Sequence, residues 1–397
     1  MQRLSAFFLM ACITGAGYGE TWLVAPFSNR SADPQLDWLG ESAAETIRES
    51  LADFKTPVVS REQRLDAVKR LSMRPNVPVS LATLIKVAEK TGAQRLIHGE
   101  VFFTPAAEPT PLVAVVVAGK AEVEPVQSRG TLRVVARVMD IARPAQLGEF
   151  AESGPLEDLP SIQANLAWRI LQLLQVANLP VRREFRKGRV TVKVPALESY
   201  MRGLAASTPE AQHRYFTQAA RLDPSFTHPR YHLGKMHFKA DNYREAVTWL
   251  SEIGRDASYY LDVQFMLGLS QFELSDFEAS RKAFEEVAAQ SPTPEAWNNL
   301  AAAQARLGMA EAFDNFRKAL EARPGDPDFH FNTGYMLWKR GEFSVAAERF
   351  RAALDRLPGD EDALYLLGRC LKSSGTRPGD IRTEGLLRLK EAAEEIK

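Results

Sequence analysis

Apolar residues follow two different rhythms along the chain, and the change of rhythm divides it into two parts. Between residues 20 and 180, short apolar runs alternate with stretches whose apolar residues recur every three or four positions. From residue 196 onward, only the second rhythm continues. The pattern predicts a small mixed-sheet α/β domain at residues 20–180, a connector at 181–195 and an all-α domain at 196–397.

The first part is expected to contain both strands and helices. Its predicted strands share branched and aromatic residues bounded by turn residues, and they are residues 21–27, 58–60, 95–103, 111–124, 131–141 and a segment around Phe150. The runs 111–124 and 131–141 are separated by a turn at 125–130, which predicts antiparallel pairing. Its predicted helices share an apolar stripe, and they are residues 36–54, 61–72, 80–91 and 161–176.

Four short motifs accompany this order of elements. They are Val24-Ala25-Pro26-Phe27-Ser28-Asn29 with Asp33-Pro34, Trp38-Leu39-Gly40-Glu41, Val58-Val59-Ser60-Arg61 and His98-Gly99-Glu100-Val101. With them, the first part resembles the small α/β domain shared by the amino-terminal part of the TolB translocation protein and the curli-secretion lipoprotein CsgG. The resemblance implies export and protein contacts at the bacterial envelope, and it supplies no catalytic residues.

The second part is periodic. A residue pair that is usually Leu-Gly recurs at spacings of 34, 33, 33 and 34 residues, at Leu233-Gly234, Leu267-Gly268, Leu300-Ala301, Thr333-Gly334 and Leu367-Gly368. A period of this length predicts stacked helical hairpins. Small residues allow two helix axes to approach closely, and a following aromatic fills the wedge between hairpins.

One copy of the repeat is the most complete. Its matching residues are Gly334, Gly341, Phe343, Ala346, Phe350, Ala353 and Pro358. The second part therefore resembles the tetratricopeptide repeat family, and we count about six repeats. The first copy, residues 197–224, is shortened, and the last is expected to place its second helix near residues 386–396, because end repeats must cover the stack.

The resemblance also supplies the residues expected to meet a partner. In this family the first helix of each hairpin lines a concave groove. The residues placed there are Tyr231, Lys235, Phe238, Lys239, Phe265, Leu269, Phe272, Asn298, Arg306, Phe331, Tyr335, Trp338, Lys339, Tyr365, Arg369 and Lys372. Large aromatics edged by Lys and Arg are typical of interface hot spots. We expect the groove to take a peptide or helix with apolar anchors and some negative charge.

An aromatic stripe at helical spacing is also typical of a core. The expected core positions of the same helices are already filled, by Leu233, Leu267, Leu337, Leu367 and Leu371. A second apolar face therefore calls for its own explanation, and both interpretations stay open.

The amino terminus has the features of an export signal. Arg3 precedes an apolar stretch, and small residues follow before Glu20, which predicts a cleaved signal peptide at residues 1–19. The same segment contains Leu9-Met10-Ala11-Cys12, which resembles a bacterial lipobox and offers a lipoprotein anchored at Cys12 as the alternative. The expected location is the periplasm or the outer envelope.

Charge and cysteine content narrow the partners and the chemistry. Fifty basic and 50 acidic residues cancel, so no global field draws the chain to nucleic acid, and we expect none as a partner. The two cysteines exclude a disulfide framework and a multi-thiolate zinc site. A basic run at residues 182–189 is interpreted as a solvated connector, with peripheral contact to anionic lipid as the alternative.

No phosphate loop, nucleophile elbow or zinc-protease helix occurs in the sequence. His228, His232 and His237 are better explained by repeat packing than by a metal site, and His98 beside Glu100 is weak evidence for acid–base chemistry. We therefore expect no cofactor and no metal, and predict a non-enzymatic exported scaffold that binds a protein partner. The alternative is an enzyme or ligand sensor with its site in the α/β domain.

Overall fold

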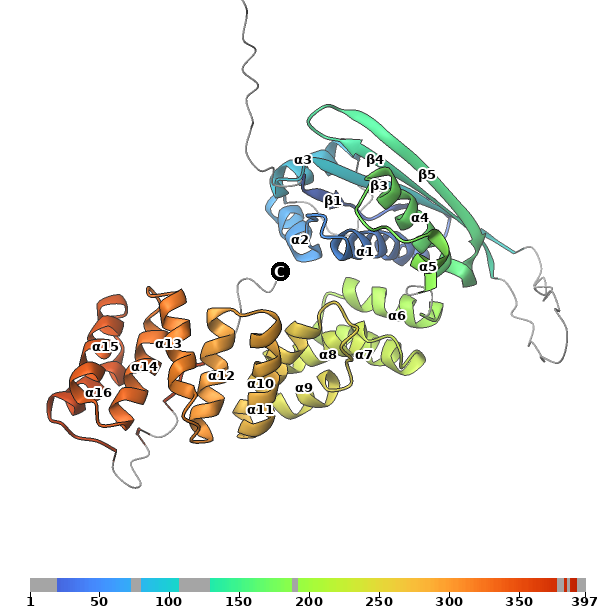
Figure 1. Cartoon of the computed structure of the whole chain (residues 1–397). Coiled ribbons are helices and arrows are strands. Elements are labelled where there is room, and N and C mark those ends of the chain that lie inside the picture. The colour runs from blue at the N-terminus through green and yellow to red at the C-terminus, as the bar shows by residue number, and fades with distance from the viewer. Residues whose placement is uncertain are drawn as a thin grey trace, which may run out of the picture. The chain divides into compact units, whose positions relative to one another are not determined.

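The chain forms two compact units, residues 1–225 and 226–397, which are described separately below (Figure 1). The computed structural model describes residues 20–72, 80–106, 129–187, 192–376, 382–383 and 386–390. The signal peptide expected at residues 1–19 and the strand expected at 111–124 lie outside these residues. The first helical pair of the predicted all-α domain belongs to the first unit by its contacts, whereas the pattern had placed it after the boundary at residue 195.

The first unit is built on a mixed sheet. Its strands are β1 (Trp22–Val24), β2 (Ser28–Asn29), β3 (Arg95–Pro105), β4 (Gly130–Asp140) and β5 (Ala145–Pro155). β1 and β2 pair with β3 in parallel, and β3, β4 and β5 pair antiparallel. The run 131–141 therefore pairs with β3 and β5, and the expected pairing of residues 111–124 with it is wrong, because both edges of β4 are already used.

The short strand expected at residues 58–60 is reduced to one bridge between Trp22 and Val58. Its extended run ends at once because Ser60 caps the next helix. The Ser60 side chain accepts from the Gln63 amide, and the Gln63 side chain accepts from the Ser60 amide.

Helices cover one face of this sheet. They are η1 (Pro34–Leu36), α1 (Trp38–Asp53), α2 (Arg61–Arg70), α3 (Leu81–Thr91), η2 (Leu156–Asp158), α4 (Leu159–Leu173), α5 (Arg182–Lys187), α6 (Val194–Ala205) and α7 (Pro209–Leu222). α1 and α4 pack side by side against the strands (Figure 1), joined by a buried hydrogen bond between Ser42 and Gln163. The α6–α7 hairpin contacts α1, and Arg61 donates to the carbonyl of Leu204 at 2.8 Å. The resemblance of this unit to the TolB and CsgG domain stays a prediction.

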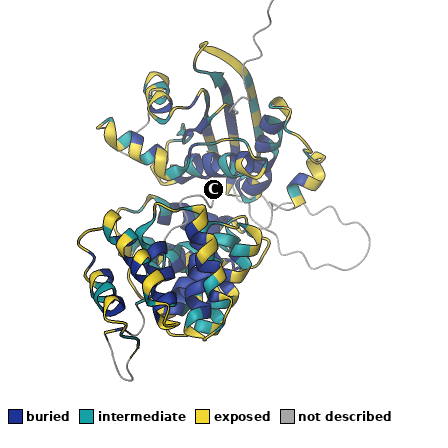
Figure 2. Cartoon of the chain, turned by 60° about the vertical axis from the view of Figure 1, so that its left-hand side comes forward, coloured by how far each residue is buried: buried dark blue, intermediate teal, exposed yellow. Residues whose placement is uncertain are grey.

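The second unit consists of helical hairpins that follow the sequence period. Its helices are α8 (His228–Lys239), α9 (Tyr243–Leu250), α10 (Tyr260–Glu273), α11 (Phe277–Gln290), α12 (Pro294–Arg306), α13 (Ala312–Ala322), α14 (Pro327–Lys339), α15 (Phe343–Arg356) and α16 (Glu361–Leu371). Successive helices pack on each other and form an α-solenoid, with the buried residues inside (Figure 2). Gly268 lies where a Cβ would meet the Phe284 ring at 2.7 Å, so this crossing requires glycine.

The end of the chain differs from the expected sixth hairpin. Residues 386–390, predicted to begin its second helix, are not helical and lie against the first helices of earlier hairpins. Leu371, expected in the core, is 64% exposed, because this segment does not pack on α16 as a second helix would. Residues 391–397 are outside the described part.

Candidate functional site: the first-helix face and the tail segment

The candidate site is the surface made by the first helices of four hairpins, α10, α12, α14 and α16, here called the first-helix face. Residues 382–383 and 386–390, the tail segment, lie on it. The side chain of Asn332 donates to the Arg388 carbonyl at 2.8 Å and accepts from the Arg388 amide at 2.9 Å. Asn299 holds the main chain of Lys390 in the same way, at 2.9 and 2.8 Å. Because alternate residues of an extended chain point the same way, this pairing shows that the segment runs extended.

The two asparagines occupy equivalent positions of successive repeats. They are 33 residues apart, on α12 and α14, each one residue before the repeated small-residue pair. Asn298 links them, since it accepts from Asn332 at 2.8 Å and donates to the Arg388 carbonyl at 2.8 Å. All three asparagine side chains are fully buried. The sequence prediction included Asn298 but missed Asn299 and Asn332, although their spacing equals the repeat period.

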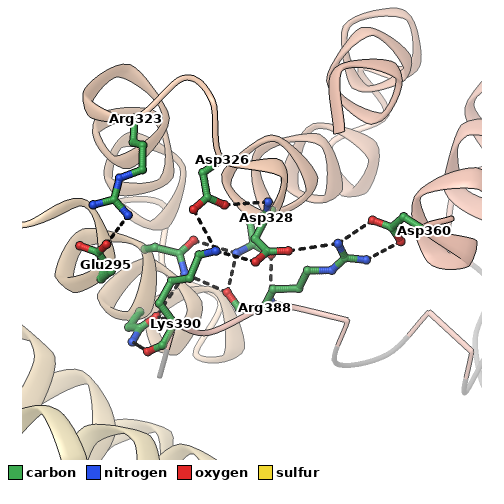
Figure 3. A network of polar contacts seen from close by, with 10 residues as sticks. Glu295, Arg323, Asp326, Asp328, Asp360, Arg388 and Lys390 are labelled. Atoms are coloured by element: carbon green, nitrogen blue, oxygen red, sulfur yellow. Dashed lines mark hydrogen bonds and ion pairs between the residues drawn. The ribbon is translucent and has the colours of Figure 1, made fainter. Parts of the chain in front are cut away.

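Three carboxylates on the same face hold the basic side chains of the tail segment (Figure 3). Arg388 lies between Asp360, at 2.6 and 2.7 Å, and Asp328, at 3.2 Å. Lys390 contacts Asp328 at 2.6 Å and Asp326 at 2.9 Å. We call Asp326, Asp328 and Asp360 the face acids. A separate ion pair, Glu295 with Arg323, lies beside them.

The sequence prediction missed the face acids, although two of them recur at a helix start. Asp326 caps α14 and Asp360 caps α16, and they are 34 residues apart, each after Pro-Gly. An N-cap carboxylate accepts a hydrogen bond from its helix and keeps an oxygen for another donor. A repeated Pro-Gly-Asp therefore places negative charge at regular intervals along the start of the first helices.

The ion pairs shift the pKa values of their members. Burial opposes ionisation of Asp360, but hydrogen bonds from Arg388 and the Ala363 amide outweigh it, so the pKa of Asp360 is lowered. Burial acts against the charge of Arg388 and Lys390 as well, yet the face acids raise the pKa of both. The three charges are therefore held in their ionised forms at neutral pH.

Aromatic side chains lie beneath the cations of the tail segment. The Arg388 guanidinium lies 3.6 Å from the ring centre of Phe331, and Arg382 lies 4.0 Å from that of Tyr365. Such stacking of a cation on an aromatic face is attractive. The Tyr335 hydroxyl donates to the Thr383 carbonyl at 2.7 Å. Trp338 donates to the Ser374 carbonyl at 2.8 Å, just after α16.

The leucines of the tail segment join the apolar core of the second unit. Leu387 is 8% exposed and belongs to the cluster around Phe331 and Trp338. Leu389 packs against that cluster and against the one that contains Phe265 and Leu269. The segment thus adds apolar contacts between the residues that are held by the face acids.

The structure places the residues predicted for partner binding in three groups. Buried residues are Phe265, Leu269, Phe272, Asn298, Phe331, Tyr335, Trp338 and Arg369. Half-buried residues are Tyr231, Lys235, Phe238 and Tyr365, and exposed ones are Lys239, Arg306, Lys339 and Lys372. Of the buried residues, Asn298, Phe331 and Tyr335 contact the tail segment directly. Phe265 and Phe331 also touch core rings, Phe284 and Phe350, so the core and partner interpretations both hold for part of the stripe.

The charge expected of a groove ligand is wrong for the segment that lies there. A ligand with some negative charge was expected because Lys and Arg flank the aromatics. Those cations are exposed at the helix ends in Lys239, Arg306 and Lys339, whereas the buried charges of the face are acids. The tail segment accordingly brings Arg388 and Lys390.

The alternative site, around His98 and Glu100 of β3, is organised as an ion-pair ladder. Glu100 accepts from Arg137 at 3.0 Å and from Arg30 at 2.8 Å, and these bonds lower its pKa. Burial and Arg137 lower the pKa of His98. Both carboxylate oxygens of Glu100 are thus held by arginines, which disfavours its use as a proton donor at neutral pH.

The basic run after α4 is partly tied to the first unit. Arg182 donates to Asn165 and Glu152, and Arg186 donates to Ser161, while the phenyl ring of Phe185 is buried. His228 packs against the rings of Phe226 and Tyr259. Within the described ranges, no group of three or more metal-binding side chains occurs. None of the helices in the described part of the chain has the length and hydropathy that a membrane crossing needs.

The period, the helical hairpins and the glycine crossings define the second unit as a tetratricopeptide-repeat α-solenoid, a module that binds proteins. A sequence model of the tetratricopeptide repeat family matches residues 265–327, 309–361 and 331–375. No curated protein matches the chain significantly.

Solved structures similar to this chain are repeat proteins. YrrB, described as a TPR protein with an unusual peptide-binding site, is 23% identical, with 43% of this chain and 90% of that chain covered and a TM-score of 0.40. The MamA RS-1 ArsTM double mutant is 20% identical over 41% and 92%, with a TM-score of 0.37. MamA from residue 41 to its end, from Desulfovibrio magneticus RS-1, is 20% identical over 42% and 95%, with a TM-score of 0.38.

Proposed function

We propose that the chain is a non-enzymatic, exported scaffold of the bacterial envelope whose first-helix face binds an extended peptide of a partner protein. The observation that carries the proposal is the pairing of Asn299 and Asn332 with the main chain of Lys390 and Arg388. Two side-chain amides that each hold both the N–H and the C=O of one residue act like a neighbouring β-strand, which is how extended peptides are gripped.

The envelope location rests on the amino-terminal pattern and on the resemblance of the α/β unit. It predicts that the mature chain begins near Glu20 and is found in the periplasm or at the outer membrane. Intact-mass measurement of the chain purified from its envelope fraction checks this. A mature chain that begins at a lipid-modified Cys12 would support the anchored form, and an unprocessed cytoplasmic chain would contradict export.

Capture of partners from envelope extracts tests the binding face. The full chain is compared with a variant carrying Asn299→Ala and Asn332→Ala, and with Asn315→Ala as a matched control. Asn315 is a buried asparagine of α13 that bonds to Gln304. We expect the same partners for the native chain and the control, and their loss from the double variant. An identical set of partners for all three baits would exclude the first-helix face as the binding site.

A further inference from the structure

The tail segment shows what kind of peptide the first-helix face selects. Main-chain pairing to Asn299 and Asn332 carries no sequence information, because every residue except proline offers an N–H and a C=O. Selection comes from the side chains between these bonds. Arg388 and Lys390 point to the face acids, and Leu387 and Leu389 enter the apolar clusters (Figure 3).

We propose that the partner peptide is extended and alternates leucine with arginine or lysine, and that residues 386–390 occupy its place in the free protein as an intramolecular competitor. This inference rests on the proposed function and names the chemistry of its ligand and its control. Leu387-Arg388-Leu389-Lys390 is the sequence that the face holds in its own chain.

The composition of the face explains why a basic peptide fits. Asp360 is 4% exposed in its side chain, and Arg388 covers it with two hydrogen bonds. A buried carboxylate without a partner is costly. A peptide that displaces the tail segment must therefore supply a cation of its own at this point, and a neutral or acidic peptide leaves Asp360 uncompensated.

The short tether makes the tail segment an effective competitor. Ten residues, 372–381, separate the end of α16 from Arg382. A short flexible tether gives an effective concentration on the order of 1 mM. If the free peptide binds with a Kd of about 10 μM, the tethered copy lowers the apparent affinity for a partner by roughly 100-fold.

Fluorescence anisotropy with a labelled peptide of residues 382–390 tests both parts of the proposal. It is titrated with the native full chain and with a tail variant of the full chain carrying Leu387→Ser, Arg388→Ser, Leu389→Ser and Lys390→Ser. A control variant, Arg317→Ser with Leu357→Ser, changes exposed residues of the same kinds elsewhere. We expect the tail variant to bind the peptide at least tenfold more tightly than the native chain and the control variant do.

Two further peptides test the chemistry. One contains glutamate in place of Arg388 and Lys390, and the other has the same composition in an order that breaks the alternation. We expect each to bind the tail variant at least tenfold more weakly than the native sequence. Equal binding of all three peptides would overturn the assigned ligand chemistry, and equal binding of the native peptide to the tail variant and the native chain would overturn the competitor.

Hydrogen exchange on the native chain keeps the test independent of whether the tail variant folds. The amides of Arg388 and Lys390 donate to asparagine side chains, so they should exchange slowly, and excess native peptide should speed their exchange. Unchanged exchange at saturating peptide would contradict displacement. Mass photometry at nanomolar concentration should show monomers, and a dimer with both tails protected would overturn the intramolecular arrangement. Capture of partners that survives these failures would leave the proposed function standing.

Discussion

Replacement of Asn332 by alanine tests the grip of the first-helix face most directly. The variant loses two hydrogen bonds to Arg388, at 2.8 and 2.9 Å, while Asn298 still donates to the same carbonyl. A typical hydrogen bond contributes about 0.5–1.5 kcal/mol net, so the loss should cost the closed tail about 1–3 kcal/mol. At about 1.4 kcal/mol per factor of ten, this predicts roughly 5- to 150-fold faster exchange of the Arg388 amide.

The assay is hydrogen exchange followed by mass spectrometry on fragments that contain residues 386–390. Asn315→Ala is the control, because Asn315 is also a buried asparagine with two side-chain hydrogen bonds, to Gln304 and Lys318. It should lower the free energy of unfolding of the second unit by a similar amount. It should change exchange of the tail fragment by less than about twofold, because that fragment opens locally rather than by global unfolding.

The comparison between fragments decides the outcome. If Asn332→Ala accelerates exchange of the tail fragment no more than that of α14 and α15, the tail does not open as a separate unit. If neither variant alters the tail fragment, Asn332 does not hold it. Either result would refute the assignment of the asparagine pair as a main-chain clamp.

Three further predictions concern pH and packing. Since the pKa of Asp360 is lowered from its ordinary value of 3.8, its stabilising effect on the tail is complete above that value and is lost as pH falls through the lowered one; Asp360→Asn, which keeps an N-cap side chain, should show weaker tail protection at pH 7 and a flatter acid profile in hydrogen exchange corrected for intrinsic rates. Burial raises the pKa of Cys370 to about 11, so its alkylation at pH 8 should be at least about tenfold slower in the native chain than in urea, and equal rates would contradict the burial. Gly40→Ala should destabilise the first unit by about 1–3 kcal/mol or more in urea titration, because its Cβ would lie 1.9 Å from the Phe27 carbonyl oxygen, whereas Gly154→Ala, with its nearest contact at 3.4 Å, should cost less than about 1 kcal/mol.

The solenoid could be predicted because its signal is repeated. Each Leu-Gly pair is weak evidence alone, but a spacing of 33 or 34 residues has one simple structural cause. The strands of the first unit were predicted from single runs of residues, and there the errors occurred. The run at 58–60 is extended but too close to the cap at Ser60 to form a strand. Pairing partners in a sheet depend on distant residues, which local patterns do not specify.

The tail segment could not be predicted from apolar spacing. The leucines at 386, 387 and 389 are compatible with a helix stripe as well as with an extended chain, because both put apolar residues toward a neighbour. What decides between them is where the main-chain hydrogen bonds go. Here the amides of Asn299 and Asn332 accept and donate them from another part of the chain. The recurrence of asparagine at one repeat position was the available signal for this surface.

The face acids connect the repeat fold to its selectivity. Asp326 and Asp360 cap α14 and α16, so the repeat needs a side chain of this kind at each position for its own stability. Serine or asparagine would cap as well, but only a carboxylate also holds Lys390 or Arg388. The preference for a cationic peptide therefore follows from the choice of acid at a position that any capping residue could fill. Since Asp360 is nearly buried by the arginine that pairs with it, rejection of unsuited peptides comes from the carboxylate that they would leave unpaired.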